Sequence, residues 1–246
     1  MVTTNSVSAR RGVRAIGAGR AHGSLTCEIL SAPVILIAVP ESAVGLVVSQ
    51  LFAFGPLRAL RAAVGTMHPL QTFSAVGIPS LEGHLFVLEG DAGALRMARA
   101  ITRALGGHAV QLKSSDKPLY HAATVVACGQ VLALVEASVQ ILASIGMKHR
   151  EAVKALLPLT RQMLENLERL GPRAAWTGPL PRGDFRVIER HHDALRASPT
   201  EFLDAYRAVN RLAARVLARD PAVLLHELKL TEDIEESTSK ARGALA

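Results

Sequence analysis

The chain predicts an α/β domain with a parallel sheet, followed by an all-α domain. As far as residue 113, short apolar runs alternate with helical segments, an arrangement typical of parallel strands joined by crossover helices. From residue 114 the strand pattern stops and apolar residues recur at helical spacing. We therefore divide the chain into an α/β domain over 1–113, an all-α domain over 114–220 and a polar C-terminal tail over 221–246.

The elements of the α/β domain follow from short apolar runs and their boundaries. The run VILIAV at 34–39 is continuously apolar and ends at Pro40, which indicates a strand buried on both faces. Asp91 is expected to cap a helix that stops at Gly106-Gly107. Further strands are predicted at 64–67, 85–88 and 108–112, and a further helix at 42–54.

The all-α domain is predicted to begin with a helix capped by Ser115 or Asp116 that runs to Gly146. A second helix over 150–170 keeps its apolar residues at helical spacing and should kink at Pro158. A Gly/Pro loop over 171–183 and helices over 184–196 and 199–218 complete the domain.

Two glycines near the N-terminus, Gly17 and Gly19 in VRAIGAGRAHG, resemble a dinucleotide-binding turn, whose glycines let backbone amides approach a pyrophosphate. However, His22 stands at the third glycine position, and only 14 residues lie between Gly19 and Val34. A βαβ unit needs about 30 residues. The sequence therefore favours an incomplete fingerprint.

Composition narrows the classes of partner. The net charge is +7, but the arginines are dispersed along the chain, and aromatic residues make up 4% of it. Nucleic-acid binding is therefore weakly supported, and a small-molecule partner is favoured. Cys27 and Cys128 lie outside any CxxC pair, which indicates a reducing compartment without structural zinc, and no signal-peptide core precedes them. We expect a cytoplasmic protein without a metal site.

Two apolar stretches, 29–54 and 122–147, approach the length of a membrane span. The second contains Glu136, Gln130 and Gln140, which are costly at the centre of a bilayer. We therefore expect no membrane contact, and predict that this helix is buried inside a homodimer.

Three basic side chains are candidate catalytic groups. Lys117 and His121 stand four residues apart, so they project from one face of the predicted helix. A lysine held beside a histidine in apolar surroundings can donate a proton near neutral pH, although the sequence alone favours a solvated Lys117 and a packed His121 ring. His68 follows a predicted strand, where open α/β sheets bind ligands, but a turn histidine is more often structural.

The loop Gly178–Gly183 allows two interpretations. Asp184 follows it, where a phosphate-binding loop would need a lysine. Asp184 either caps the next helix, or Arg182 faces an anion while the glycines bring backbone amides close to it.

Taken together, the segments IAVPES, HPLQTF, KPLYHAA, NLERLGP and TGPLPRGD resemble one bacterial family of Rossmann-like proteins that carry a C-terminal domain of unknown function, number 2520. That family is described as NADP oxidoreductases and is similar in outline to deazaflavin-dependent NADP reductase, pyrroline-5-carboxylate reductase and the 6-phosphogluconate dehydrogenase group. The resemblance covers about residues 10–218 and lacks the first βαβ unit, as if the N-terminus were truncated.

The resemblance implies an incomplete Rossmann-like domain followed by a helical, dimerising domain like that of 6-phosphogluconate dehydrogenase, with the site in a cleft between them. In the related dehydrogenases a lysine at this helix start often serves as the acid, which suits Lys117. The motif positions that face the cofactor are Val39 and Pro40, and those that face the cleft are His68, Lys117, His121, Asn166, Thr177, Arg182 and Asp184.

The function that follows is an oxidoreductase that uses NADP or NAD on a small carbonyl or imine substrate. The alternative is a non-catalytic dimeric ligand-binding or scaffold protein built on a degenerate Rossmann half.

Overall fold

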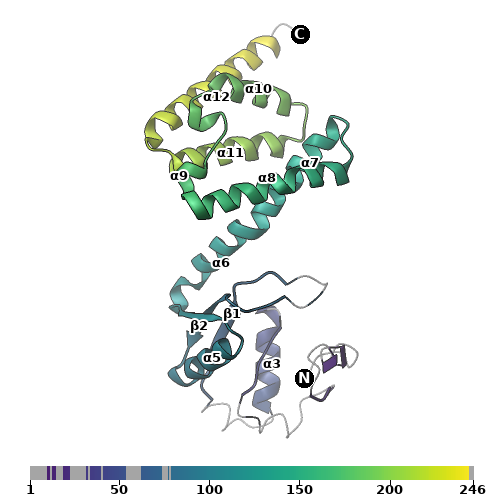
Figure 1. The fold of residues 1–246 in the computed structure, drawn as a ribbon, viewed down its shortest axis with the longest axis vertical. Coiled ribbons are helices and arrows are strands. Elements are labelled where there is room, and N and C mark those ends of the chain that lie inside the picture. Colours follow the sequence, from purple (N-terminus) through teal and green to yellow (C-terminus); the bar gives the residue numbers. More distant parts are fainter. Residues whose placement is uncertain are drawn as a thin grey trace. The chain divides into compact units, whose positions relative to one another are not determined.

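A computed structural model describes residues 10–11, 13–14, 19–22, 32, 34–39, 41–53, 62–73, 77 and 79–243. The chain divides into two compact units, residues 1–118 and 119–246 (Figure 1). Within the described residues the fold is mixed α/β and mostly helical, with a three-stranded sheet in the first unit.

The sheet of the first unit has the order β1-β2-β3, with β1 at Gly65–Pro69, β2 at Leu85–Gly90 and β3 at His108–Gln111. β2 and β3 are parallel, as predicted, but β1 and β2 are antiparallel, with Gly65 opposite Gly90. The prediction of an all-parallel sheet is therefore wrong at β1. Parallel neighbours need a long crossover, usually a helix, whereas the described residues between β1 and β2 form turns and irregular chain.

The predicted strand at 34–39 is also wrong. These residues form no strand, and Leu36 is 70% exposed. Continuous apolar character does not by itself distinguish a strand from other extended chain. The helix predicted after it is confirmed as α3, Glu41–Ala53. The Gly17 turn lies outside the described residues.

One face of the sheet packs against α5, Ala92–Ala104. Phe86 and Leu88 alternate along β2 and are buried with Leu95 of the helix. Asp91 is the N-cap by position, but its side chain does not bond the helix. Its carboxylate instead accepts a hydrogen bond from the Val64 backbone N–H at 2.9 Å, which ties the start of β1 to the start of α5.

Helices form after residue 114 where the sequence predicts them. The cap predicted at Ser115 or Asp116 is wrong, because both residues lie inside the first helical turn and Lys113 is at its N-cap position. A continuous helical segment begins with η1, Ser114–Asp116, and passes through a π-helical turn, η2, at Val126–Gln130. Pro158 lies inside α8, as expected. The α-helices are α6 (Lys117–Val125), α7 (Val131–Ser144), α8 (His149–Leu170), α9 (Pro172–Ala175), α10 (Phe185–Leu195), α11 (Thr200–Leu217) and α12 (Pro221–Gly243).

The core of the second unit joins a loop to three helices. Leu180, from the short 3₁₀ turn η3 (Leu180–Arg182), packs with Ile188, Ala214 and Leu228, which are all less than 5% exposed. Since these residues come from four separate segments, the cluster fixes α10, α11 and α12 around the loop.

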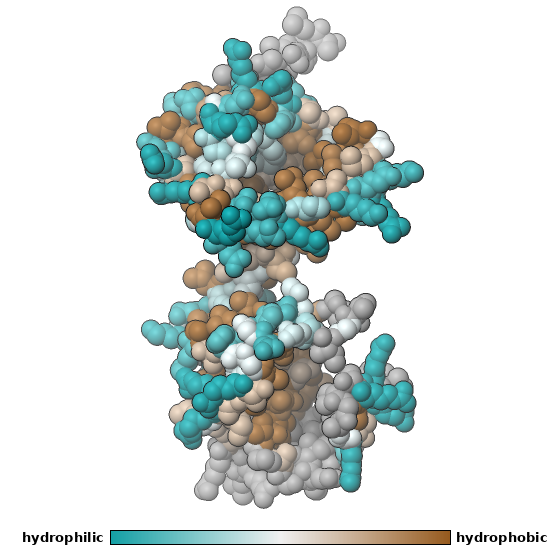
Figure 2. Space-filling model, in the orientation of Figure 1, coloured by the Kyte–Doolittle hydropathy of each residue, from teal (hydrophilic) through white to brown (hydrophobic). Residues whose placement is uncertain are grey.

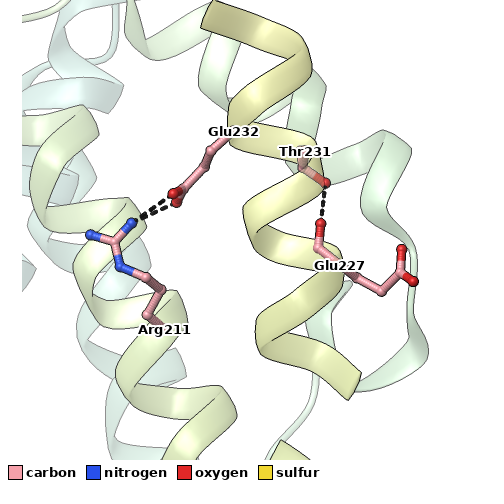
Figure 3. A network of polar contacts seen from close by, with 4 residues as sticks. All are labelled: Arg211, Glu227, Thr231 and Glu232. Atoms are coloured by element: carbon pink, nitrogen blue, oxygen red, sulfur yellow. Dashed lines mark hydrogen bonds and ion pairs between the residues drawn. The ribbon is translucent and has the colours of Figure 1, made fainter. Parts of the chain in front are cut away.

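The polar tail predicted from residue 221 is wrong for residues 221–232, because α12 supplies a core residue. A bidentate ion pair adds to this packing: Arg211 Nη1 on α11 lies 2.7 and 2.9 Å from the two carboxylate oxygens of Glu232 (Figure 3). On the same helix, the hydroxyl of Thr231 donates to the Glu227 carbonyl at 2.9 Å. The polar residues of this segment therefore belong to a helix, α12, that has one buried face.

Apolar side chains remain exposed on the second unit and on α6. By length and composition, the helical segment Ser114–Ser144 could cross a membrane. Its apolar stretch of 18 residues has a mean hydropathy of 1.8, and 6% of that stretch is buried. Figure 2 shows hydrophobic residues reaching the surface of both units. The most exposed apolar side chains of this segment and of α8 are Leu119, Leu132, Leu159 and Leu170.

Candidate functional site

Lys117 is the first residue of α6, and its ammonium forms an ion pair with Glu89 at the end of β2. Lys117 Nζ lies 3.7 Å from Glu89 Oε2, and the two side chains are 48% and 18% exposed. The apolar surroundings assumed for Lys117 are therefore not found. The lysine is half exposed beside a carboxylate, and Glu89 is a polar residue that the sequence motifs did not indicate.

The register of the sheet brings His68 to the same face as Glu89. Thr66 is opposite Glu89 and His68 is opposite Val87, and residues opposite one another or two apart on a strand share a face. His68 and Glu89 are diagonal neighbours, and residues in such pairs are about 7–8 Å apart, with their Cβ atoms somewhat closer. This face is opposite to the one that Phe86 and Leu88 turn to α5.

The position predicted for His68 needs a correction. His68 does not follow a strand at the carboxyl edge of a parallel sheet. It lies within β1 and is exposed, and since β1 is antiparallel it sits beside the middle of β2. His68 and Glu89 thus share one face of the sheet, and Lys117 is linked to that face by its ion pair with Glu89. The two basic residues do not lie together at the end of a strand.

His121 lies on α6, four residues after Lys117, and is exposed. A step of four residues is about 6 Å along a helix and returns to the same face. Its carbonyl accepts a hydrogen bond from the Thr124 hydroxyl at 2.8 Å, which is local to the helix. The packed ring that the simpler interpretation required is therefore not observed.

The loop before α10 is organised as a helix entry. Asp184 is the N-cap, and its Oδ1 accepts from the Val187 N–H at 3.4 Å. The backbone N–H groups of Arg182 and Asp184 bond the Pro179 carbonyl, and that of Gly183 bonds the Leu180 carbonyl. These amides are therefore engaged within the loop, which confirms the capping interpretation and leaves Arg182 only its exposed side chain for an anion.

The remaining predicted contact residues are dispersed. Thr177 is exposed. The Asn166 side chain accepts a hydrogen bond from Gln162 Nε2 at 3.3 Å on α8. Val39 is 39% exposed at the end of a segment that forms no strand, and Pro40 lies outside the described residues.

A polar cluster inside the second unit was missed in the sequence. His191 Nδ1 and Tyr206 Oη are 2.8 Å apart, and the fully buried His192 ring meets Tyr206 edge-on with centroids 5.6 Å apart. Burial raises the pKa of Tyr206, and a smaller opposing effect comes from a hydrogen bond with Asn210. The signal in the sequence was the paired histidine that follows the TGPLPRGD segment.

The raised pKa of Tyr206 predicts alkaline instability. The unfolded phenol titrates near pH 10, so the stabilisation from the neutral folded phenol is complete below that pH and is lost as pH rises through the higher folded value. We expect Tyr206→Phe to remove this part of the alkaline fall in the free energy of unfolding. Urea unfolding of both proteins at pH 9 and above pH 10 measures it, and parallel pH profiles would contradict it.

Two solved structures share this fold. Protein TM1727 from Thermotoga maritima superposes with a TM-score of 0.63 at 19% identity, over 94% of this chain and 90% of that chain. A protein from Bacteroides fragilis named "putative NADP oxidoreductase BF3122" superposes with a TM-score of 0.65 at 19% identity, over 85% of each chain. The mixed α/β architecture with its small sheet thus fits a Rossmann-like fold.

The family follows from the sequence match. Residues 84–213 match the model of the domain of unknown function DUF2520, and the chain belongs to that family. The family predicted from the motifs is thereby confirmed. A comparison with curated proteins finds no match.

Proposed function

We propose that this protein is an NAD(P)-dependent oxidoreductase that reduces a small carbonyl or imine compound in the cytoplasm. The observation that carries the proposal is the side-chain set on one sheet face, where the ammonium of Lys117 is held beside Glu89 and His68 shares the face. The structural similarity to a protein named as an NADP oxidoreductase supports it.

The residues fit the substrate side of this chemistry better than the nucleotide side. Of the two predicted cofactor contacts, Val39 ends a segment without strand structure, so the strand-end turn that would face a dinucleotide is not formed by the described residues. When bound, the nicotinamide supplies a hydride. The proton that completes the reduction must come from a side chain of the protein or from water.

The protein's own contribution is proton transfer and substrate binding. Lys117 Nζ gives a proton to the oxygen or nitrogen of the substrate that becomes negative on reduction. His121, one helical turn after Lys117 on α6, and His68, on the sheet face that carries Glu89, remain further candidate proton donors. In the second unit, the Thr177 and Arg182 side chains are exposed and remain candidate substrate contacts, together with Asn166 and Asp184.

An NADPH titration followed by the fluorescence of NADPH itself tests the proposal. We expect saturable binding in the micromolar range, then NADPH oxidation with a panel of small aldehydes, ketones and cyclic imines. A folded protein that binds no nucleotide would contradict the proposal and favour the non-catalytic ligand-binding or scaffold alternative.

Lys117→Ala is expected to lower turnover by about a hundredfold or more, because a positioned general acid contributes about 10²–10⁴. The matched control is Lys113→Ala, which removes an exposed lysine from the same segment. Steady-state rates with a substrate from the panel measure both variants. Equal turnover in Lys117→Ala and the wild type would remove the acid role.

We further propose that the protein is a homodimer joined through its helical unit. Apolar side chains of α7 and α8 are exposed, among them Leu132, Leu159 and Leu164. Burial against a second copy would remove this apolar area from water. Sedimentation should give twice the chain mass, and Leu164→Lys should lower it to that of one chain.

A further inference from the structure

We infer that Glu89 is a positioning residue for Lys117. The inference rests on the proposed function, in which Lys117 donates a proton. Glu89 is the less exposed partner of the ion pair, at 18% against 48% for Lys117. A lysine carries its charge on a flexible four-carbon stem, so the less exposed carboxylate favours one location for the ammonium.

The backbone that carries Glu89 is itself held firmly. The next residue, Gly90, is paired with Gly65 across the two strands. The backbones are so close there that a Cβ on Gly90 would overlap the Val64 carbonyl oxygen and the Gly65 Cα. Asp91 then bonds Val64 twice, through its own N–H to the Val64 carbonyl at 2.9 Å and through its carboxylate to the Val64 N–H at 2.9 Å. The backbone at the end of β2, from which the Glu89 side chain extends, is therefore restrained by close packing and by two hydrogen bonds.

This placement selects the sheet face on which Lys117 acts. Glu89 lies opposite Thr66 and diagonal to His68, so its side chain belongs to the sheet face that also carries Thr66 and His68. Without the carboxylate, the lysine stem is free to sample solvent. Because a half-exposed ion pair contributes little to stability, its removal should change the orientation of Lys117 without unfolding the protein.

Lysine reactivity tests the positioning without requiring any enzymatic activity. Reductive methylation of the intact protein, followed by mass spectrometry, gives a rate for each lysine. In Glu89→Gln we expect Lys117 to react about threefold faster than in the wild type, since an ion pair of this exposure restrains it only modestly. Lys154, exposed on α8, is the reference within each sample, and Glu82→Gln is the matched control variant.

The variant Glu89→Asp keeps the charge but withdraws it by one methylene, so an intermediate rate is expected. It also provides the measurement if Glu89→Gln does not fold. Equal Lys117 rates in the wild type and a folded Glu89 variant would overturn the inference.

Kinetics separate this inference from the proposed function. If both hold, Glu89→Gln should lower kcat about tenfold with KM nearly unchanged, because a misplaced catalytic group costs rate, and Glu89→Asp should recover part of it. If Lys117 reactivity changes but Lys117→Ala retains full turnover, the acid role fails while the positioning by Glu89 stands.

Discussion

Replacing Leu228 with alanine is expected to lower the free energy of unfolding of the helical unit by about 2–5 kcal/mol, the usual cost of truncating a buried leucine. Leu228 is 1% exposed and packs with Leu180, Ile188 and Ala214. The truncation opens a cavity where α10, α11, α12 and the loop before α10 meet. Denaturant unfolding followed by the fluorescence of Trp176, which packs against this cluster, measures the effect.

The matched control is Leu230→Ala. Leu230 is on the same helix two residues later and is 42% exposed, so its truncation should cost well under half as much. Equal losses at the two positions would show that α12 does not pack through Leu228. In that case residues 221–232 would behave as the polar tail that the composition of the segment suggests.

The error over α12 has a specific cause. The segment is polar on average, but Leu224, Leu225, Leu228 and Thr231 recur at helical spacing and are the residues that meet the core or are buried. A period of 3.6 was thus present in a segment judged by its mean composition. Helix α8 was predicted from apolar residues at this same spacing.

Strand direction could not be predicted in the same way. The segments that became β1 and β2 were located within a few residues, since apolar runs and flanking glycines are local features. Whether β1 runs with or against β2 depends on how residues 70–84 return the chain, and that is a tertiary property. The false strand at 34–39 shows the same limit, because its apolar run needs a partner to become a strand.

The candidate site likewise contains residues that local sequence motifs indicate and one residue that only the tertiary structure shows. Lys117 and His68 were identified from the types and spacing of residues in short motifs. Glu89 was missed because its importance depends on register: only the pairing of Thr66 with Glu89, and the return of the chain to α6, bring its carboxylate to Lys117. Of the two interpretations of the loop before α10, the cap at Asp184 is the one observed, and it could be proposed from the sequence because capping involves residues three apart.

Gly90→Ala is expected to cost about 3 kcal/mol or more of stability in the first unit, or to prevent its folding. Gly90 has a φ of +132°, a backbone conformation that residues other than glycine rarely adopt. The new methyl group would also overlap the Val64 carbonyl oxygen and the Gly65 Cα. Backbone atoms cannot rotate away as a side chain does, so the strands would have to separate. Thermal unfolding by circular dichroism measures the loss.

Gly83→Ala is the control that separates strain from overlap. Gly83 has a φ of +73°, and a Cβ there would meet nothing within 4 Å, so only the left-handed backbone is penalised, by about 1–2 kcal/mol. If Gly90→Ala were no more destabilising than Gly83→Ala, β1 and β2 would not approach each other at Gly65 and Gly90. The register would then be wrong, and with it the pairing that sets Glu89 beside Thr66. A large excess cost at Gly90 instead supports the strand crossing on which the position of Glu89, and therefore of Lys117, depends.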